Sequence, residues 1–258
     1  MSDFSIDFQV ASDKRIRFGR MPWDEEAIEH PVYRVEVSGD AQDVEPGIAD
    51  MLTRIREHGR AYAMAKLDPE EIEWLAALTK AGFYVTETSV DPFRVLARYE
   101  PGRRFPRLVL REAREEDLDT LVSIASEAFS RGRYHLDPNL PSGSGDRRYA
   151  GWVQRAFRDG QLLFTFEDTK ANKVLGFYHV RDLGGGTANL ALAAIEEGAR
   201  GAGLGAVMYD QCLEECVKRG FQRVETTISI ANTAVMNVFA QLGFLFRDPK
   251  IVLHWSSE

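Results

Sequence analysis

The chain has 258 residues, of which 44% are hydrophobic and 28% charged, and its formal net charge is −8 at pH 7. This length suits one main domain with a smaller companion, and the composition is that of an ordinary soluble globular protein. The negative charge disfavours binding along a nucleic-acid backbone. No apolar run reaches the ~20 residues that span a membrane.

The cysteines and histidines lack the spacing of a metal site. Cys212 and Cys216 are four apart in a predicted helix, which indicates a buried apolar pair and not a disulfide. The five histidines form no HExxH motif, so no metal is expected. The first ten residues show no secretory signal, and we expect a cytoplasmic protein.

The first third of the chain predicts alternating helices and strands. Residues 45–59 place apolar side chains at helical spacing and end at a glycine, and residues 61–67 are typical of a short strand. Residues 68–82 predict a second helix with Asp68 as its N-cap, followed by a strand over 83–90. This pattern predicts a small α/β domain.

The segment YEPGRRFPR, residues 99–107, interrupts the periodicity with two prolines, a glycine and three arginines. It is the predicted boundary between a domain of residues 1–105 and a domain of residues 106–258. The elements expected after it are strand 108–113, helices 114–129 and 145–160, strands 162–167, 174–183 and 187–195, a helix from 204, strand 223–230, helix 232–243, and strands 244–248 and 250–255. This order indicates an α+β fold with a mixed sheet.

Two short segments resemble each other across the predicted boundary. LTKAGFYVTE (residues 78–87) and FAQLGFLFRD (residues 239–248) each run from a helix through Gly-Phe into a strand. The likeness is either accidental or the trace of a truncated copy of the same fold.

The stretch EEGARGAGLGAVMYD, residues 196–210, places three glycines before a predicted helix, as in phosphate-binding turns. No Lys-Ser or Lys-Thr follows, which excludes a Walker A loop. Gly201, Gly203 and Ala206 satisfy a tolerant dinucleotide motif, but its acid, Glu225, lies near the start of a predicted strand where it should end one. The pattern [QR]-x-x-G-x-[GA], which starts at Arg200, fits better.

With this motif and a second one, the region from about 107 to 255 resembles the GNAT superfamily of acyl-CoA-dependent N-acyltransferases. The second motif, N-x-x-A-x-x-x-Y-x-x-x-G-F, falls on Asn232, Val235, Phe239, Gly243 and Phe244, with Val and Phe in place of Ala and Tyr. The resemblance implies a GNAT fold, a mixed and splayed sheet flanked by helices, with a smaller N-terminal α/β domain. It also implies acetyl-CoA as cosubstrate.

The resemblance further implies a cofactor site along one strand and the glycine turn. Glycines let backbone N–H groups approach the pyrophosphate, and a bulged strand would pair with the pantetheine arm. Asn232 is either only a helix N-cap or a contact of the pantetheine amide, and Arg200 either contacts phosphate or is solvated. The expected cofactor-binding residues are Ala193, Ile195, Arg200, Gly201, Ala202, Gly203, Leu204, Gly205, Asn232 and Phe239.

Phe239 stands where many GNAT enzymes have the tyrosine that protonates the departing thiolate. Phenylalanine has no ionisable proton, so this role does not carry over. Ser229, Thr227, Tyr209 or water are possible replacements, and a CoA-binding relative without turnover is the alternative.

Several side chains are candidates for the general base that takes the proton of the amine. His179 and Glu225 are the catalytic candidates, with Tyr178 and His135 as further options. A histidine on a sheet is more often a core residue, which is the competing interpretation of His179.

An arginine-rich segment, residues 129–152, is the expected acceptor-binding loop, with Arg131, Arg133, Tyr134 and His135 as candidates. Guanidinium groups would suit a diphosphate on the acceptor, whereas the alternative is a solvated loop. The stretch FSRGRYHLDP is similar to sugar-nucleotide N-acetyltransferases, which implies a nucleotide-linked amino deoxysugar as the acceptor. An antibiotic, a polyamine or a peptide N-terminus are rivals, and the oligomeric state is open, with a homodimer as one option.

Overall fold

The computed structural model describes residues 6–57, 59–102, 104–130, 132–201 and 203–257. The chain divides into two compact units, and each is described by itself. Unit 1 comprises Met1–Ser89, Gly132–Ser144 and Asp248–Glu258, and unit 2 comprises Val90–Arg131 and Gly145–Arg247. The predicted boundary near residue 105 does not coincide with this division, because both units are discontinuous in sequence.

Unit 1 contains a mixed sheet with the strand order β1-β2-β3-β4-β12. Its strands are β1 (Gln9–Val10), β2 (Ile16–Arg20), β3 (Val32–Val37), β4 (Tyr62–Leu67) and the second half of β12 (Leu245–Ser256). Its helices are α1 (Pro22–Ile28), α2 (Glu45–Arg56), α3 (Ile72–Lys80) and α5 (Arg133–Leu136). β3 and β4 are parallel and the other pairs antiparallel.

The predicted helices of the first third are confirmed, with one difference at the second. α3 begins at Ile72, and its N-cap is Glu71. Asp68 lies outside the helix, where its backbone N–H donates to the Glu71 carboxylate at 2.7 Å. The apolar side of α2 packs into the unit 1 core, in which Ile48 and Ile55 are buried.

Unit 2 contains a second mixed sheet, with the order β5-β10-β9-β8-β7-β6. Its strands are β5 (Tyr84–Val95), of which the second half belongs here, β6 (Leu108–Glu112), β7 (Leu162–Asp168), β8 (Lys173–Asp182), β9 (Thr187–Ile195) and β10 (Arg223–Glu225), while the short β11 (Ile228–Ser229) pairs with β5. β9 and β10 are parallel.

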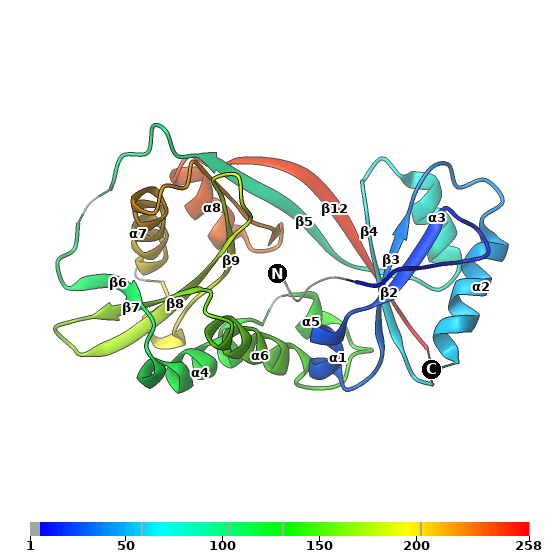
Figure 1. The fold of residues 1–258 in the computed structure, drawn as a ribbon, viewed down its shortest axis with the longest axis horizontal. Helices are drawn as coiled ribbons and strands as arrows, with labels where there is room; N and C mark the ends of the chain where they lie inside the picture. Colours follow the sequence, from blue (N-terminus) through cyan, green and yellow to red (C-terminus); the bar gives the residue numbers. More distant parts are fainter. Residues whose placement is uncertain (1–5, 58, 103, 131, 202, 258) are drawn as a thin grey trace. The chain divides into compact units, whose positions relative to one another are not determined.

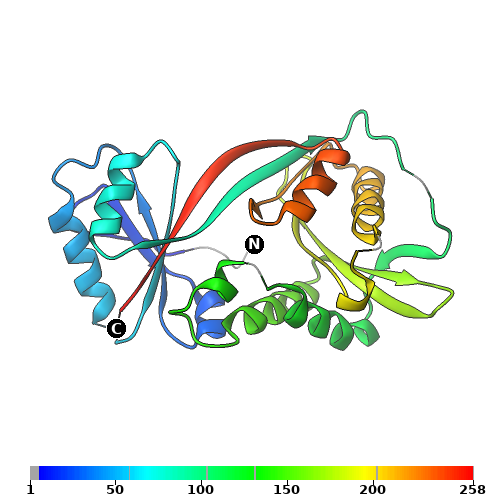
Figure 2. The same ribbon diagram turned by 180° about the vertical axis from the view of Figure 1, so that it is seen from behind.

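Helices cover both faces of the unit 2 sheet (Figures 1 and 2). α4 (Leu118–Ala128) and α6 (Ser144–Arg158) pack on one face, and α7 (Leu204–Lys218) and α8 (Thr233–Gln241) on the other. Two short 3-10 helices, η1 (Glu115–Asp117) and η2 (Glu197–Ala199), precede α4 and α7. Cys212 and Cys216 are buried free cysteines on the inner side of α7, as predicted.

The two units repeat one topology. In each, a parallel strand pair (β3 and β4, or β9 and β10) is followed by a helix, a Gly-Phe step and a long strand. The second half of β5 pairs antiparallel with β10 inside unit 2, and the second half of β12 pairs antiparallel with β4 inside unit 1. The two similar sequence segments fall on these equivalent steps.

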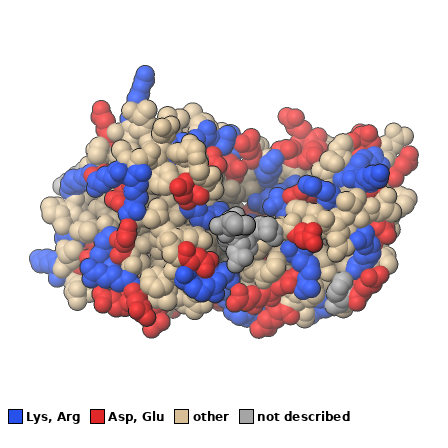
Figure 3. All heavy atoms as spheres, in the orientation of Figure 1, with Lys and Arg blue, Asp and Glu red and all other residues tan. Residues whose placement is uncertain are grey.

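Charged side chains of both signs are mixed on the face of the molecule that Figure 3 shows. On the face shown in Figure 3, basic and acidic residues alternate, and the described residues of that face form no extended basic patch. Among the described residues, none of the helices is long and apolar enough to cross a membrane.

Candidate active site

The centre of unit 2 is a strand that parts from its neighbour. β10 pairs with β9 only over Arg223–Glu225, opposite Thr187–Asn189, whereas β9 continues to Ile195. The register of β8 against β9 shifts at the same level, since His179 faces Leu192 while the next residue faces Leu190, which leaves a bulge in β9. Beyond Asn189, β9 therefore offers a backbone edge to which an extended ligand could pair.

The glycine turn lies between the end of β9 and α7. Gly201 and Gly203 have φ values of 81° and 75°, the left-handed region that favours glycine, and Gly203 is the N-cap of α7. A Cβ at Gly205, in the first turn of the helix, would meet no atom within 4 Å. No side chain caps this 15-residue helix in the described part of the chain, so its first N–H groups are not taken by a capping side chain, as an anion site requires. Leu204 begins the helix and packs on the core, and Ala202 lies outside the described residues.

Arg200 fastens this turn to the sheet. Its Nε donates to the Ile195 carbonyl and its Nη2 to the Ala128 carbonyl, both at 3.1 Å. Neither of the two sequence-based alternatives, a phosphate contact or a solvated side chain, included this role. The guanidinium thus ties the turn to the end of β9 and to the end of α4.

Asn232 acts as the N-cap of α8. Its side chain accepts from the Val235 N–H at 3.3 Å, which confirms the capping interpretation. The side chain is exposed, and its contact with the pantetheine amide stays a prediction.

Phe239 is a core residue packed among aromatic rings. It is 1% exposed and meets Tyr209 edge to face, with ring centroids 4.9 Å apart, and Phe244 at 4.5 Å. Tyr209 in turn meets Tyr178 of β8 edge to face at 5.1 Å. Position 239 offers apolar surface and no proton.

His179 is buried on the opposite face of the sheet. It is 1% exposed, its Nε2 lies 2.7 Å from Gln161 Oε1, and its ring meets the edge of Trp152. Burial, and then the charge of Arg181, lowers the pKa of His179 to about 3, so the ring is neutral near pH 7. This environment favours the competing interpretation of His179 as a core residue.

Glu225 ends the short strand β10 and is engaged by two arginines. Its Oε2 lies 2.9 Å from Arg247 Nη2 and 3.4 Å from Arg223 Nε. Both guanidinium groups also stack over the Phe93 ring. These ion pairs engage the Glu225 carboxylate with protein cations, which disfavours the catalytic role expected for it.

The expected acceptor residues belong to unit 1. Arg133 pairs with Glu87 at 2.7 Å, and the buried Tyr134 donates to Asp24 at 3.0 Å. His135 lies in the same short helix, α5, and Arg131 lies outside the described residues. The Glu87 contact balances the charge of Arg133, which weakens the expectation that this guanidinium binds a diphosphate.

A buried polar network beside these residues was not predicted from the sequence. Asp137 accepts from Tyr84 at 3.0 Å and lies 2.6 Å from His254 Nδ1. Burial opposes ionisation of Asp137, but the hydrogen bond from His254 prevails and lowers the pKa of this carboxyl. The network could not be predicted from local sequence patterns, because Asp137 and His254 are 117 residues apart.

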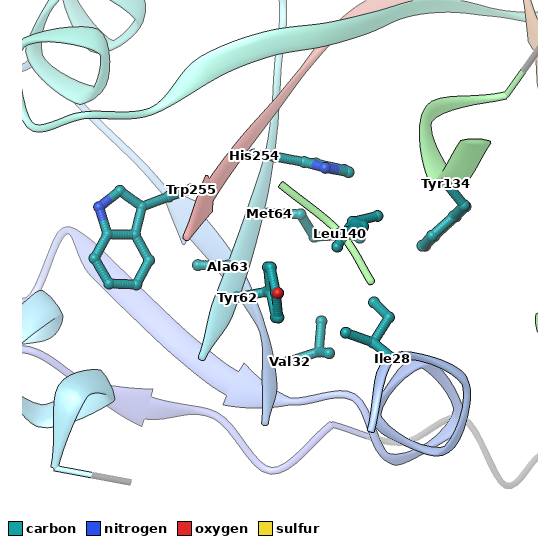
Figure 4. A pocket seen from close by; sticks show the side chains of 9 residues that line it. All are labelled: Ile28, Val32, Tyr62, Ala63, Met64, Tyr134, Leu140, His254 and Trp255. Atoms are coloured by element: carbon teal, nitrogen blue, oxygen red, sulfur yellow. The ribbon is translucent and has the colours of Figure 1, made fainter. Parts of the chain in front are cut away.

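A small cavity adjoins this network (Figure 4). Its volume is about 10 Å³, enough for one water molecule at most. Its walls are mainly apolar, formed by Ile28, Val32, Tyr62, Ala63, Met64, Tyr134, Leu140, His254 and Trp255. The cavity is too small for an acceptor substrate. Within the described part of the chain, no group of three or more His, Cys, Asp or Glu side chains could hold a metal ion.

Residues 107–245 match the Acetyltransferase (GNAT) domain family. The match covers more than half of the chain, so the chain belongs to the GNAT acetyltransferases and is an acyltransferase. It is 29% identical, over 182 residues, to the dTDP-fucosamine acetyltransferase of Escherichia coli O6:H1 strain CFT073, which is 69% of this chain and 75% of that protein.

Solved structures share the fold. A GCN5-related N-acetyltransferase from Sphaerobacter thermophilus, 12% identical, has a TM-score of 0.67 and covers 94% of this chain and 76% of its own. One from Kribbella flavida, also 12% identical, has a TM-score of 0.67 and covers 97% and 89%. A tandem GNAT protein from the clavulanic acid biosynthesis pathway, 16% identical, has a TM-score of 0.63 and covers 93% and 78%. The expected GNAT fold is confirmed.

Proposed function

We propose that this acyltransferase uses acetyl-CoA to acetylate a primary amine on a small molecule. The observation that carries the proposal is the backbone edge of β9 beyond Asn189, which leads to the glycine turn at the start of α7. An extended pantetheine arm would pair with that edge, and its pyrophosphate would lie against the helix N-terminus. Arg200 would act by fixing the turn between these two parts.

The reaction needs little more from the chain than placement of the two reactants. The neutral amine attacks the thioester carbonyl, and the C–S bond of the intermediate breaks. A backbone N–H at the β9 bulge would stabilise the charge that develops on the carbonyl oxygen. Holding the amine at the carbonyl supplies much of the acceleration, so the missing tyrosine at Phe239 does not by itself prevent turnover.

For the acceptor, we propose a nucleotide-linked amino deoxysugar. The support is the likeness to an acetyltransferase named for dTDP-fucosamine, together with the similar stretch from Phe129 to Pro138. Because Arg133 is paired with Glu87, recognition of the nucleotide would need either that pair to open or other cations.

A thiol-release assay with acetyl-CoA tests the proposal. A panel of dTDP- and UDP-linked amino sugars is compared with a polyamine, an aminoglycoside and a peptide N-terminus. The proposal predicts rapid release with at least one sugar nucleotide and slow release with the others. Release only with a non-nucleotide amine would overturn the acceptor assignment. Tight CoA binding without release for any amine would favour a non-catalytic relative.

A further inference from the structure

A tyrosine of α7 packs on the face of the unit 2 sheet that α7 and α8 cover. Strand register places Tyr178 of β8 opposite Ala193, whose side chain packs in the same core between the sheet and the helices α7 and α8. Tyr209 meets the Tyr178 ring at 5.1 Å and 88°, and the Phe239 ring at 4.9 Å and 83°. Figure 2 shows the two helices over β8 and β9. The Tyr209 ring therefore lies between the ring of Tyr178, which is the strand partner of Ala193, and the ring of Phe239.

The hydroxyl of Tyr209 is protonated and can donate a hydrogen bond. Among the described residues, no protein group exchanges a hydrogen bond with it, and the hydroxyl is not one of the fully buried polar atoms, so it can donate to a ligand. Burial, and to a lesser degree Cys212, raises the pKa of Tyr209, so the phenol keeps its proton at neutral pH. A ligand atom that carries negative charge is the natural partner for such a donor.

Other hydroxyl groups of unit 2 are less suitable. Thr227 already donates to Asp91 at 2.7 Å, and Ser229 lies on β11, which pairs with β5 and not with β9. Tyr178 is only 1% exposed and lies deeper, beneath α7. Tyr209 is partly exposed and contacts Phe239 directly.

We propose that Tyr209 is a catalytic residue whose hydroxyl donates a hydrogen bond to the thioester sulfur as the C–S bond breaks. The inference rests on the proposed function, because it places the pantetheine arm along β9. The amine nitrogen forms the new C–N bond, the sulfur leaves with the electron pair of the C–S bond, and the nitrogen gives up one proton to solvent. The thiolate, stabilised by the phenol, takes one proton from solvent as CoA departs. Tyr209 ends the cycle unchanged.

The test is Tyr209→Phe, which removes only the hydroxyl, with Tyr178→Phe as the matched control. Because Tyr209→Phe removes a hydrogen bond to an atom that becomes charged in the transition state, we expect kcat to fall about 10- to 100-fold. The Kd for CoA should stay unchanged. Tyr178→Phe should stay within about threefold of wild type, the ordinary scatter of a neutral change. The loss should shrink for an acetyl thioester whose leaving thiol is more acidic, because its sulfur needs less stabilisation.

A second variant separates loss of the hydroxyl from a change in packing caused by Tyr209→Phe. In the Tyr209→Phe background, Phe239→Tyr restores a phenol next to the same site and should recover part of kcat. The inference is overturned if Tyr209→Phe retains full kcat, if Tyr178→Phe causes the larger loss, or if the loss is the same for both leaving groups. A wild-type protein that releases no CoA with any amine would instead refute the proposed function.

Discussion

Arg200 donates through Nε to the backbone carbonyl of Ile195 at 3.1 Å, and this bond closes the turn between β9 and α7. The same guanidinium reaches the carbonyl of Ala128 at the end of α4. The position of the glycine turn thus depends on a side chain that need not touch the ligand.

We expect Arg200→Ala to raise the KM for acetyl-CoA by about 10- to 30-fold, since it removes two hydrogen bonds worth roughly 1 kcal/mol each. The kcat should change little, because the reacting atoms lie at the other end of the cofactor. Steady-state kinetics with varied acetyl-CoA measure both values. Arg158→Ala, which removes an exposed arginine paired with its neighbour Asp159, is the control. Equal KM values for the two variants would contradict the role assigned to Arg200.

His179 should remain neutral throughout the physiological pH range. Its folded pKa of about 3 lies below the unfolded value near 6.5, so between these values only the unfolded state binds the proton. The free energy of unfolding contributed by His179 is fully present above about pH 6.5 and is lost as the pH falls toward 3. NMR titration of the imidazole, assigned with His179→Gln, should show no transition above about pH 4.

A transition of His179 near pH 6.5 would contradict the buried environment. It would also reopen the case for His179 as the general base. His30→Gln, a partly buried histidine in unit 1, controls for effects of the substitution itself.

Asp137 should be a stability residue of unit 1. Asp137→Ala leaves the Tyr84 hydroxyl and the His254 ring without their acceptor, which costs about 3 kcal/mol at such a buried site. Asp137→Asn keeps one oxygen and should cost less. Urea unfolding followed by tryptophan fluorescence suits the test, because three of the four tryptophans lie in unit 1. The exposed Glu70→Ala should shift stability by less than about 0.5 kcal/mol, and a similar effect for Asp137→Ala would refute the prediction.

The fragment 106–258 should not fold as an independent domain. It lacks Phe93–Val95, the antiparallel partner of β10, and also the buried Leu96. The unpaired strand edge favours aggregation. A fragment of residues 90–247 keeps these contacts and should be the more soluble, as size-exclusion chromatography and circular dichroism would show. Cooperative melting of 106–258 at the wild-type temperature would support the simple boundary near residue 105.

Sequence patterns predicted those features of unit 2 that depend on residues close together in the chain. Asn232 begins its helix as its side chain suggested, and the glycine turn stands before α7 because Gly201 and Gly203 adopt left-handed φ. The element order followed from hydrophobic periodicity and from the breaks at glycine and proline.

The remaining features depend on contacts between residues far apart in sequence. Strand periodicity shows that β5 and β12 are strands but not which strand each one pairs with, so the exchange of strand ends was not predicted. The engagement of Glu225 by Arg247 and of Arg133 by Glu87 depends on the same long-range pairing. Folding brings each of these charged side chains to an oppositely charged partner. The sequence alone does not show that partner, so it makes the side chain look free to bind a substrate when it is already paired.

Gly205 provides the most direct test of the CoA site, since a side chain there meets only open space. Asp in the first turn of α7 favours the helix but repels a pyrophosphate, whereas Asn has nearly the same shape without the charge. Calorimetric titration with CoA should show Gly205→Asp binding at least about tenfold more weakly than Gly205→Asn, since one repelled charge costs 1 kcal/mol or more. Equal affinities for the two variants and the wild type would place the pyrophosphate elsewhere and contradict the account.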